Sequence, residues 1–205
     1  MSIDTFLAFA AATMVLLVIP GPTILLVVSY ALGQGWRAAV PLAIGVALGD
    51  FTAMTLSLFG VGALLQASAT LFTVLKWIGA AYLIYLGFKL FRAGGTLDVA
   101  PVTDAKSSLK MLGHAWIVTA LNPKSITFFV AFVPQFVNHD APFAPQALIM
   151  VATFVVLAFT NAFGYAFIAA RARTTFANPT AIKIFNRTGG TLLMGAGVAA
   201  VTIRS

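Results

Sequence analysis

Six long apolar stretches alternate with shorter polar ones along the chain. They cover approximately residues 3–32, 38–65, 71–91, 113–137, 147–170 and 188–203. Since a helix needs roughly 20 apolar residues to cross the hydrocarbon core of a membrane, each stretch is predicted to be one transmembrane helix. A polar linker, residues 92–112, separates the first three from the last three. The pattern predicts an all-α, polytopic membrane protein with a single transmembrane domain over residues 1–205.

Two of the six stretches, the first and the fourth, contain helix-breaking residues near their middles. The residues at the two breaks are Pro20, Gly21, Pro22, Asn122, Pro123 and Lys124. Proline removes a backbone donor and clashes with the preceding turn, so a helix kinks or stops there. In hydrocarbon such a break is tolerated only against protein or a water-filled cavity. Broken helices at matching places in two halves of a chain indicate the binding site of a transporter.

The two halves of the chain resemble repeats of each other. Gly79 and Gly87 in the third stretch match Gly189 and Gly197 in the sixth at one offset. Residues 3–91 and 113–203 are therefore predicted to be two three-helix repeats. An odd number of helices per repeat makes the repeats inverted in the membrane, which is an alternating-access architecture. The alternative is that these glycines only allow close helix packing, and for Gly87, Gly195 and Gly197 we favour that interpretation.

Composition and charge support a membrane protein and give its orientation. The chain is 60% hydrophobic and only 8% charged, whereas soluble domains carry about 25% charged residues. The net charge of +7 does not indicate nucleic-acid binding, because the cations gather between apolar stretches. The loops at residues 66–70 and 138–146 contain no Lys or Arg. The positive-inside rule therefore predicts that the other loops, including the linker, are cytoplasmic and that both termini lie outside.

Only two charged residues, Asp50 and Lys124, lie deep within the predicted helices. Each is about 17–18 Å from the cytoplasmic end of its helix at 1.5 Å per residue, close to the midplane of a core about 30 Å thick. A buried membrane charge is costly and suggests a function. The alternative is an Asp50–Lys124 ion pair that merely links helices. Asn122 and Asn161 are polar at a comparable depth, and for Asn161 we favour a simple interhelical hydrogen bond.

Several short motifs occur in an order that is specific when taken together. They are Pro20-Gly21-Pro22, Gly45-x-x-x-Gly49-Asp50, Leu121-Asn122-Pro123-Lys124, Phe128-Phe129, Pro134-Gln135-Phe136 and Asn186-x-x-Gly189-Gly190. Over its whole length the chain resembles the lysine exporter family, and within it the homoserine/threonine resistance branch of bacterial amino-acid exporters. The resemblance implies a multi-pass exporter in the bacterial inner membrane that is driven by the proton gradient. It leaves the substrate open among neutral, basic and modified amino acids.

The candidate site residues suggest how a zwitterionic substrate is bound. Pro22 suits the first turn of a helix that restarts after the break, and the free N–H groups there favour a carboxylate. Lys124 adds a positive charge for the carboxylate, and Asp50 supplies the negative charge for an ammonium. Asp50 is also the candidate carrier of a coupling proton. With no other deep carboxylate, and with Phe128 and Phe129 expected in an apolar lining, the site favours small neutral or hydroxylated amino acids.

Three other interpretations remain at this stage. An intramembrane enzyme is disfavoured because Cys and Glu are absent from the sequence, and because His114 and His139 are predicted at opposite membrane edges. No metal or cofactor is expected for the same reasons. A passive channel or a flippase for small solutes is the nearer alternative. The Gly45-x-x-x-Gly49 motif allows a homodimer but serves equally well for packing within one subunit.

Overall fold

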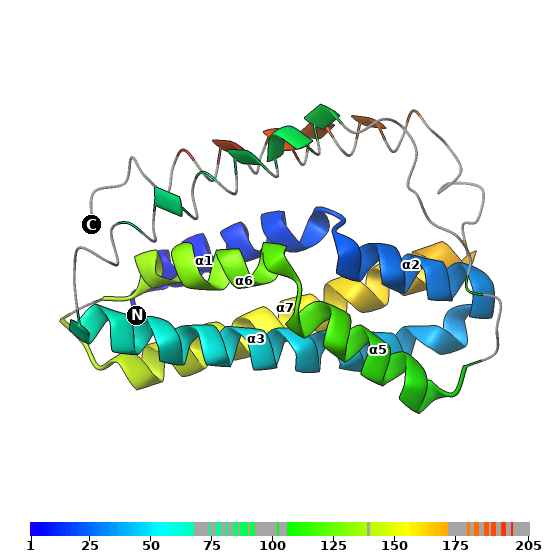
Figure 1. Ribbon diagram of the computed structural model, residues 1–205, viewed down its shortest axis with the longest axis horizontal. Coiled ribbons are helices and arrows are strands. Elements are labelled where there is room, and N and C mark those ends of the chain that lie inside the picture. Colours follow the sequence, from blue (N-terminus) through cyan, green and yellow to red (C-terminus); the bar gives the residue numbers. More distant parts are fainter. Residues whose placement is uncertain are drawn as a thin grey trace.

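The computed structural model describes most of the two predicted repeats. The described residues are 1–67 (without the side chains of 61–67), 106–138 and 140–171, together with isolated residues between 74 and 102 and between 180 and 198. The helices are α1 (Ile3–Val18), α2 (Pro22–Gln34), η1 (Trp36–Ala38), α3 (Ala39–Ala67), α5 (Ser108–Ala120), α6 (Pro123–Ala131), η2 (Val133–Phe136) and α7 (Phe143–Arg171). These described elements are all helical, and they run roughly along one common axis (Figure 1).

Four of the predicted spans can be recognised in these helices. The stretch Trp36–Gly60, most of it α3, and α7 are each long and apolar enough to cross a membrane. The other two are bent pairs: α1 and α2 meet at 55°, and α5 meets the α6–η2 segment at 47°. The structure therefore breaks the first and fourth spans where the prolines predicted it. α5 begins at Ser108, inside the segment predicted as linker, with the Ser107 side chain capping its first turn.

The third and sixth predicted spans lie largely outside the described residues, and so do Gly79, Gly189 and Gly197. Among the glycines that are described there, a Cβ added to Gly87 would lie 2.6 Å from the carbonyl oxygen of Gly190. Such a Cβ on Gly195 would have no described residue within 4 Å. Close packing is therefore seen at Gly87 but not at Gly195. The pairing of the two halves as inverted repeats remains a prediction.

The small residues of α3 bring it into close contact with α5. A Cβ on Gly45 would overlap the carbonyl oxygen of Leu112, and a Cβ on Gly49 would lie 2.6 Å from Cβ of Thr119. The side chain of Trp116, on the same helix, donates to the Thr52 hydroxyl at 3.2 Å. The Gly45-x-x-x-Gly49 face therefore packs within one subunit. A homodimer, if one forms, has to use another surface.

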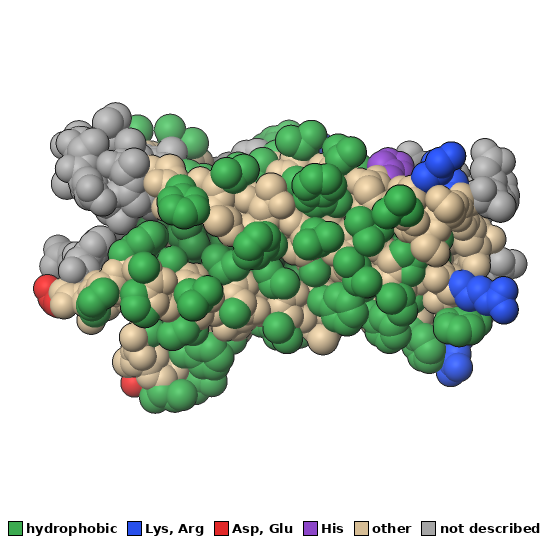
Figure 2. Space-filling view, turned by 90° about the horizontal axis from the view of Figure 1, so that it is seen from below, with side chains coloured by type: hydrophobic (Ala, Val, Ile, Leu, Met, Phe, Trp, Pro, Cys, Tyr) green, Lys and Arg blue, Asp and Glu red, His purple; other side chains and the backbone are tan. Residues whose placement is uncertain are grey.

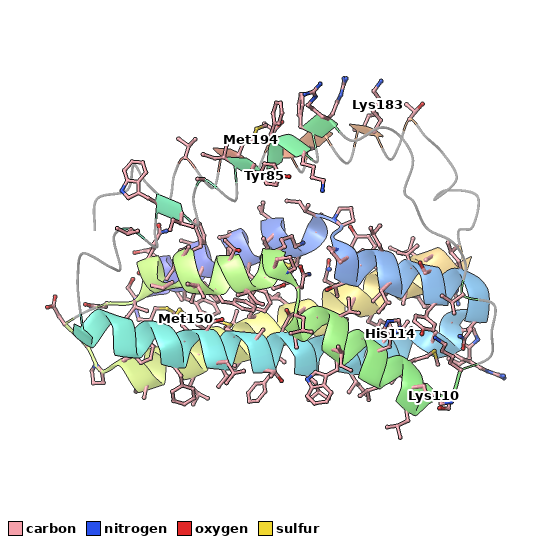
Figure 3. All side chains as sticks on the ribbon, viewed as in Figure 1. Tyr85, Lys110, His114, Met150, Lys183 and Met194 are labelled. Atoms are coloured by element: carbon pink, nitrogen blue, oxygen red, sulfur yellow. The ribbon has the colours of Figure 1, made fainter. Side chains whose placement is uncertain are left out.

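The ends of the bundle differ in charge. In Figure 2 hydrophobic side chains cover the middle of the visible face, Lys and Arg gather at one end, and Asp appears at the other. Arg171 ends α7 at the basic end, and Asp4 lies in the first turn of α1 at the opposite one. Figure 3 places Lys110 at the basic end and His114 farther in along α5. This separation agrees with the loop charges that predict a cytoplasmic basic end.

Part of the linker is held against α2 at the basic end. The backbone N–H of Val102 donates to the carbonyl of Ser29 at 3.1 Å. Lys106 donates to the Tyr30 hydroxyl at 3.0 Å, and that hydroxyl lies 2.9 Å from Nδ1 of His114. His114 therefore takes part in a contact between the linker, α2 and α5. His139, its predicted counterpart at the other end, lies outside the described residues.

Candidate functional site

The first break leaves four backbone carbonyls at the end of α1 without their normal helical partners. In an α-helix the carbonyl of residue i accepts from the N–H of residue i+4. Pro20 and Pro22 have no N–H, so the carbonyls of Leu16 and Val18 lose their partners. α1 ends at Val18, with Ile19 extended, so the carbonyls of Leu17 and Ile19 also leave the helical pattern. Buried carbonyls need other donors.

Lys124 satisfies two of these carbonyls from across the site. Its Nζ atom donates to the carbonyl of Ile19 at 2.7 Å and to that of Leu16 at 3.0 Å. The Lys124 side chain is only 9% exposed. The positive charge therefore lies at the carbonyl end of α1, where the helix dipole favours a cation. A Cβ on Gly21 would be 3.4 Å from Cε of Lys124, so the side chain passes close to the extended part of the break.

Two side chains of α7 satisfy the remaining carbonyls. Asn161 donates to the carbonyl of Leu17 at 3.0 Å, and the Tyr165 hydroxyl donates to that of Val18 at 2.6 Å. The interhelical hydrogen bond expected for Asn161 is thus present. Tyr165 was not a predicted site residue. Tyr165 lies one helical turn after Asn161, so both side chains are on the same face of α7. This spacing indicates a site residue only if α7 is known to pack against the first break.

The other side of the first break is the N-terminus of α2, whose backbone N–H groups are not capped by a side chain. Gly21 is the N-cap residue and Pro22 the first helical residue, so no side chain caps this end. The first N–H groups of a helix have no partner within it and form a positively charged end. This end is therefore suited to bind an anionic group.

At the second break, hydrogen bonds between neighbouring residues cap the start of α6 and the end of α5. The Asn122 side chain accepts from the N–H of Lys124 at 3.0 Å and so caps α6. The N–H of Leu121 donates to the carbonyl of Ile117 at 3.1 Å, and that of Asn122 to the carbonyl of Thr119 at 3.0 Å. Pro123 occupies the first position of α6, where proline is well tolerated because no N–H is needed. This break therefore forms a well-defined turn between two half-helices.

A short polar contact joins the two breaks. The Thr23 hydroxyl, in the first turn of α2, accepts from the Asn122 side chain at 3.0 Å. The Thr119 hydroxyl also donates to Thr23, at 3.3 Å. All three side chains are buried. The contact places the uncapped end of α2 directly beside the capped end of α6.

Asp50 approaches the same place from α3. The residue is 2% exposed, and its Oδ1 atom is buried without a hydrogen-bond partner in the part of the chain that the structure describes. The Lys124 ammonium donates to the carbonyls of α1 rather than to this carboxylate. The alternative of a simple Asp50–Lys124 ion pair is therefore not the arrangement in this structure. The unpartnered oxygen leaves Asp50 able to accept from a ligand.

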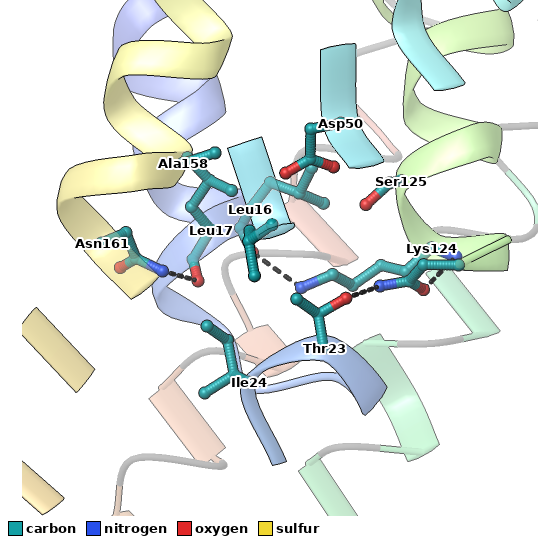
Figure 4. Close-up of a pocket in the computed structure, with 11 residues that line it drawn as sticks. Leu16, Leu17, Thr23, Ile24, Asp50, Lys124, Ser125, Ala158 and Asn161 are labelled. Carbon is teal, nitrogen blue, oxygen red and sulfur yellow. Dashed lines mark hydrogen bonds between the residues drawn. The ribbon is translucent and has the colours of Figure 1, made fainter. Parts of the chain in front are cut away.

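These groups surround one small cavity (Figure 4). Its lining residues are Leu16, Leu17, Thr23, Ile24, Val46, Asp50, Asn122, Lys124, Ser125, Ala158 and Asn161. Its volume is about 20 Å³, which holds about one water molecule. The cavity must therefore widen before it can admit a larger ligand.

The structure brings together only some of the predicted site residues. Asp50, Asn122 and Lys124 line the cavity. Pro20, Gly21, Pro22 and Pro123 are not lining residues and instead shape the two breaks. Thr23 and Ser125 also line the cavity but were not predicted. They directly follow Pro22 and Lys124 in sequence, and this position next to the breaks could have identified them.

Phe128 and Phe129 do not line the cavity, contrary to the expectation from their position after the second break. Both are buried in an aromatic cluster with Phe154 of α7, at ring-centroid distances of 6.1 Å and 4.7 Å. They lie one turn or more beyond Lys124 on α6, so they pack against α7 instead of facing the break. Their contribution is to hold α6 in place.

No group of three or more potential metal ligands among His, Cys, Asp and Glu occurs in the part of the chain that the structure describes. The polar groups at the cavity are instead one carboxylate, one ammonium, hydroxyls and amides. Such a set can bind a small charged or zwitterionic molecule through hydrogen bonds.

Comparison with known proteins places the chain in a family. The family model described as LysE type translocator matches residues 14–203. An "Uncharacterized membrane protein" of Vibrio cholerae is 32% identical over 205 residues, which cover 100% of both chains. A "Homoserine/homoserine lactone efflux protein" of Salmonella typhimurium is 31% identical over 204 residues, covering 100% of this chain and 99% of the relative.

A further relative is named for a different amino acid. A "Leucine efflux protein" of Salmonella choleraesuis is 32% identical over 139 residues, covering 67% of this chain and 66% of the relative. No solved structure matches the chain. The match of the family model over nearly the whole length, together with these relatives, shows that the chain belongs to the LysE type translocator family.

Proposed function

We propose that this protein exports small neutral amino acids or close analogues across the bacterial inner membrane in exchange for protons. The observation that carries the proposal is the meeting of three features at one cavity: the uncapped N-terminus of α2, the ammonium of Lys124 and the carboxylate of Asp50, whose Oδ1 atom has no hydrogen-bond partner among the described residues. Relatives named as homoserine/homoserine lactone and leucine efflux proteins support export of amino acids.

The carboxylate of the substrate binds between α2 and Lys124. An ammonium has three hydrogen-bond donors, and Lys124 uses two of them for the carbonyls of α1. The third donor and the free N–H groups at the start of α2 are then available to a carboxylate. Thr23, whose hydroxyl already accepts from Asn122, fixes that end of α2 beside the substrate.

Asp50 binds the substrate ammonium and carries the coupling proton. It is the only carboxylate among the residues that line the cavity. Because one carboxylate binds either the substrate ammonium or a proton, substrate binding and protonation exclude each other. Binding of substrate from the cytoplasm then releases a proton, and its departure outside allows a proton to return. Exchange follows from this competition.

The walls of the cavity limit the class of substrate. Leu16, Leu17, Ile24, Val46 and Ala158 supply apolar surface. A lysine or arginine substrate needs a second anion for its side chain, and the lining contains none. A dianionic substrate would bring a second carboxylate close to Asp50, and like charges at close range cost several kcal/mol. Small neutral or hydroxylated side chains fit these constraints.

A growth panel tests the proposal. Cells that overexpress the protein are challenged with toxic concentrations of single amino acids, with Asp50→Asn and Lys124→Ala variants as controls of equal expression. We expect protection against homoserine, threonine, leucine or a similar neutral species, and loss of protection in both variants. Protection only against lysine or arginine would overturn the substrate class, and no protection by any amino acid would overturn amino-acid export.

The mode of transport needs a separate measurement. In everted membrane vesicles, uptake of the protecting amino acid against its gradient should require an imposed proton gradient and should stop when a protonophore is added. A passive channel would equilibrate the amino acid but would not accumulate it. An enzyme would instead convert the amino acid to a product, which mass spectrometry of the vesicle contents would detect.

A further inference from the structure

We propose that Val102 and Lys106 of the linker form a strap that holds α2 against α5, and that release of this strap opens the cavity toward the basic end of the bundle. The strap contacts lie apart from the groups that line the cavity. The inference therefore goes beyond the proposed function, because it concerns access to the site and applies to any molecule that the site binds.

The backbone of the linker docks on one face of α2. The N–H of Val102 donates to the carbonyl of Ser29 at 3.1 Å, and a Cβ on Gly33 would overlap the carbonyl oxygen of Val102. Ser29 and Gly33 are four residues apart, so they lie on the same face of the helix. The linker therefore rests directly on the backbone of α2, at a position that only glycine leaves open.

A buried hydroxyl fastens the side chain of the strap to both helices. Tyr30 is 0% exposed, and its hydroxyl accepts from Lys106 at 3.0 Å and lies 2.9 Å from Nδ1 of His114. A hydroxyl has one proton, and here that proton is left to donate to Nδ1. The Lys106 ammonium also lies 5.4 Å from the centroid of the Tyr30 ring, within the range of a cation–π contact. One residue of α2 thus connects the linker and α5.

These contacts tie α2 to α5 at the end that lies away from the cavity. At the other end α2 lines the cavity with Thr23 and Ile24, and Thr119 of α5 donates to Thr23 at 3.3 Å. Tyr30 is seven residues after Thr23, which is about 10 Å along the helix. Since the cavity must widen to admit a larger ligand, the strap opposes any widening that moves α2 away from α5.

Of these two helices, α2 is the one that moves. α5 packs closely on α3, where a Cβ on Gly45 or Gly49 would overlap atoms of α5. α2 is instead separated from α1 by a break in which Ile19 and Gly21 are extended, so it can turn about the break without carrying α1 with it. Once the strap has left, this movement widens the cavity on the side of the basic end.

The accessibility of single cysteines tests the strap without any substrate. The chain contains no cysteine, so each introduced thiol reports on one position. Val46→Cys replaces a buried lining residue on α3, between Asp50 and the basic end. Leu58→Cys replaces a buried residue of the same helix on the other side of Asp50. The rate at which each thiol reacts with a polar maleimide is measured in open membrane fragments, where both ends of the protein are accessible.

Two substitutions release the strap by different means, and each has a matched control. Gly33→Ala places a Cβ where the Val102 carbonyl lies, and its control is Gly113→Ala on α5, whose Cβ would have no described residue within 4 Å. Lys106→Met removes the ammonium but keeps a side chain of similar length. Its control is Lys110→Met, at an exposed lysine in the first turn of α5.

We expect each strap variant to speed the labelling of Val46→Cys by about 3- to 10-fold, the factor that corresponds to the loss of a hydrogen bond. The controls should label like the parent protein, and the labelling of Leu58→Cys should not change. Equal rates in strap variants and controls would overturn the proposal, and so would faster labelling at both reporters, which indicates general loosening. Lys106 is exposed, so Lys106→Met keeps the test decisive if Gly33→Ala does not fold.

The same experiment separates the strap from the proposed function. If the wild type transports no amino acid while the strap variants still speed the labelling of Val46→Cys, amino-acid export is wrong and the strap stands. If the wild type exports an amino acid and the strap variants label like their controls, export stands and the strap is wrong.

Discussion

The two breaks in the helices are similar in sequence but are completed in different ways. At the second break, the Asn122 side chain caps α6, and backbone N–H groups donate to two of the last carbonyls of α5, those of Ile117 and Thr119. At the first break, the carbonyls of α1 depend on Lys124 from α6 and on two side chains of α7. The N-terminus of α2 has no side-chain cap at all.

This difference suggests different roles for the two breaks. A turn that is completed by its own residues keeps its shape when neighbouring helices move. A break that is completed by α6 and α7 changes whenever those helices shift relative to α1. We therefore infer that the second break is a fixed frame that supplies Lys124. In the proposed transport cycle, the first break would be the part that responds to ligand.

The largest expected effect comes from removing the charge that completes the first break. Lys124→Met leaves the Leu16 and Ile19 carbonyls without their donor. An unsatisfied buried polar group costs about 1–3 kcal/mol, so the variant should lose about 2–6 kcal/mol of stability. Thermal or denaturant unfolding in detergent measures the loss. Lys110→Met, at an exposed residue in the first turn of α5, is the matched control and should unfold like the wild type.

Equal stability of the two lysine variants would contradict the role that we assign to Lys124. It would mean that the carbonyls of Leu16 and Ile19 find other donors when the ammonium is removed.

The second-largest effect is expected at the contact between α3 and α5, which positions the second break. In Gly49→Ala the new Cβ would lie 2.6 Å from Cβ of Thr119 and 2.7 Å from the carbonyl oxygen of Trp116. Since backbone cannot move aside easily, α5 is pushed away, at a cost of about 1–3 kcal/mol. Gly60→Ala, on the same helix but with nothing within 4 Å, is the control. The yield of monodisperse protein and its unfolding temperature compare the two.

If Gly49→Ala is as stable as Gly60→Ala, the separation between α3 and α5 is larger than described. In that case the Gly45-x-x-x-Gly49 face would again be free to serve a dimer.

The positions of the breaks were predictable because their cause is local. Proline in a helix leaves a carbonyl without its donor wherever the helix lies, so Pro20 and Pro123 fixed the places where the first and fourth spans bend. The depth of Asp50 and Lys124 could also be counted, because a helix rises by a constant amount per residue. Both residues do line the same cavity.

The partners within the site were not predictable, because they depend on how α6 and α7 rotate against α1. The charges of Lys124 and Asp50 left an ion pair open as an alternative, yet the Lys124 ammonium donates to the backbone carbonyls of Leu16 and Ile19. Similarly, Phe128 looked like a lining residue from its distance to the break. Its contact with Phe154 follows only from tertiary packing.

A smaller effect is expected at α7, where one side chain satisfies one carbonyl. Tyr165→Phe removes only the hydroxyl that donates to the carbonyl of Val18 at 2.6 Å. The expected loss of stability is about 0.5–1.5 kcal/mol, the usual net value of one hydrogen bond. Thr160→Val is the control, since the Thr160 hydroxyl bonds only to carbonyls of its own helix. An effect of Tyr165→Phe no larger than that of Thr160→Val would show that the Val18 carbonyl does not need the Tyr165 hydroxyl.

The smallest effect is expected at Gly21, although it lies in the middle of the first break. Its φ angle is −119°, which any residue can adopt, and an added Cβ would be in ordinary contact with Lys124 at 3.4 Å. Gly21→Ala should therefore change stability by no more than about 0.5 kcal/mol. Gly35→Ala at the other end of α2 should cost more, about 1–2 kcal/mol, because Gly35 has a φ of +74°. The comparison becomes informative in the export assay: if Gly21→Ala folds normally but no longer protects cells, the substrate must approach the Cα of Gly21 directly. That result would place the carboxylate closer to the extended residues of the break than to Lys124.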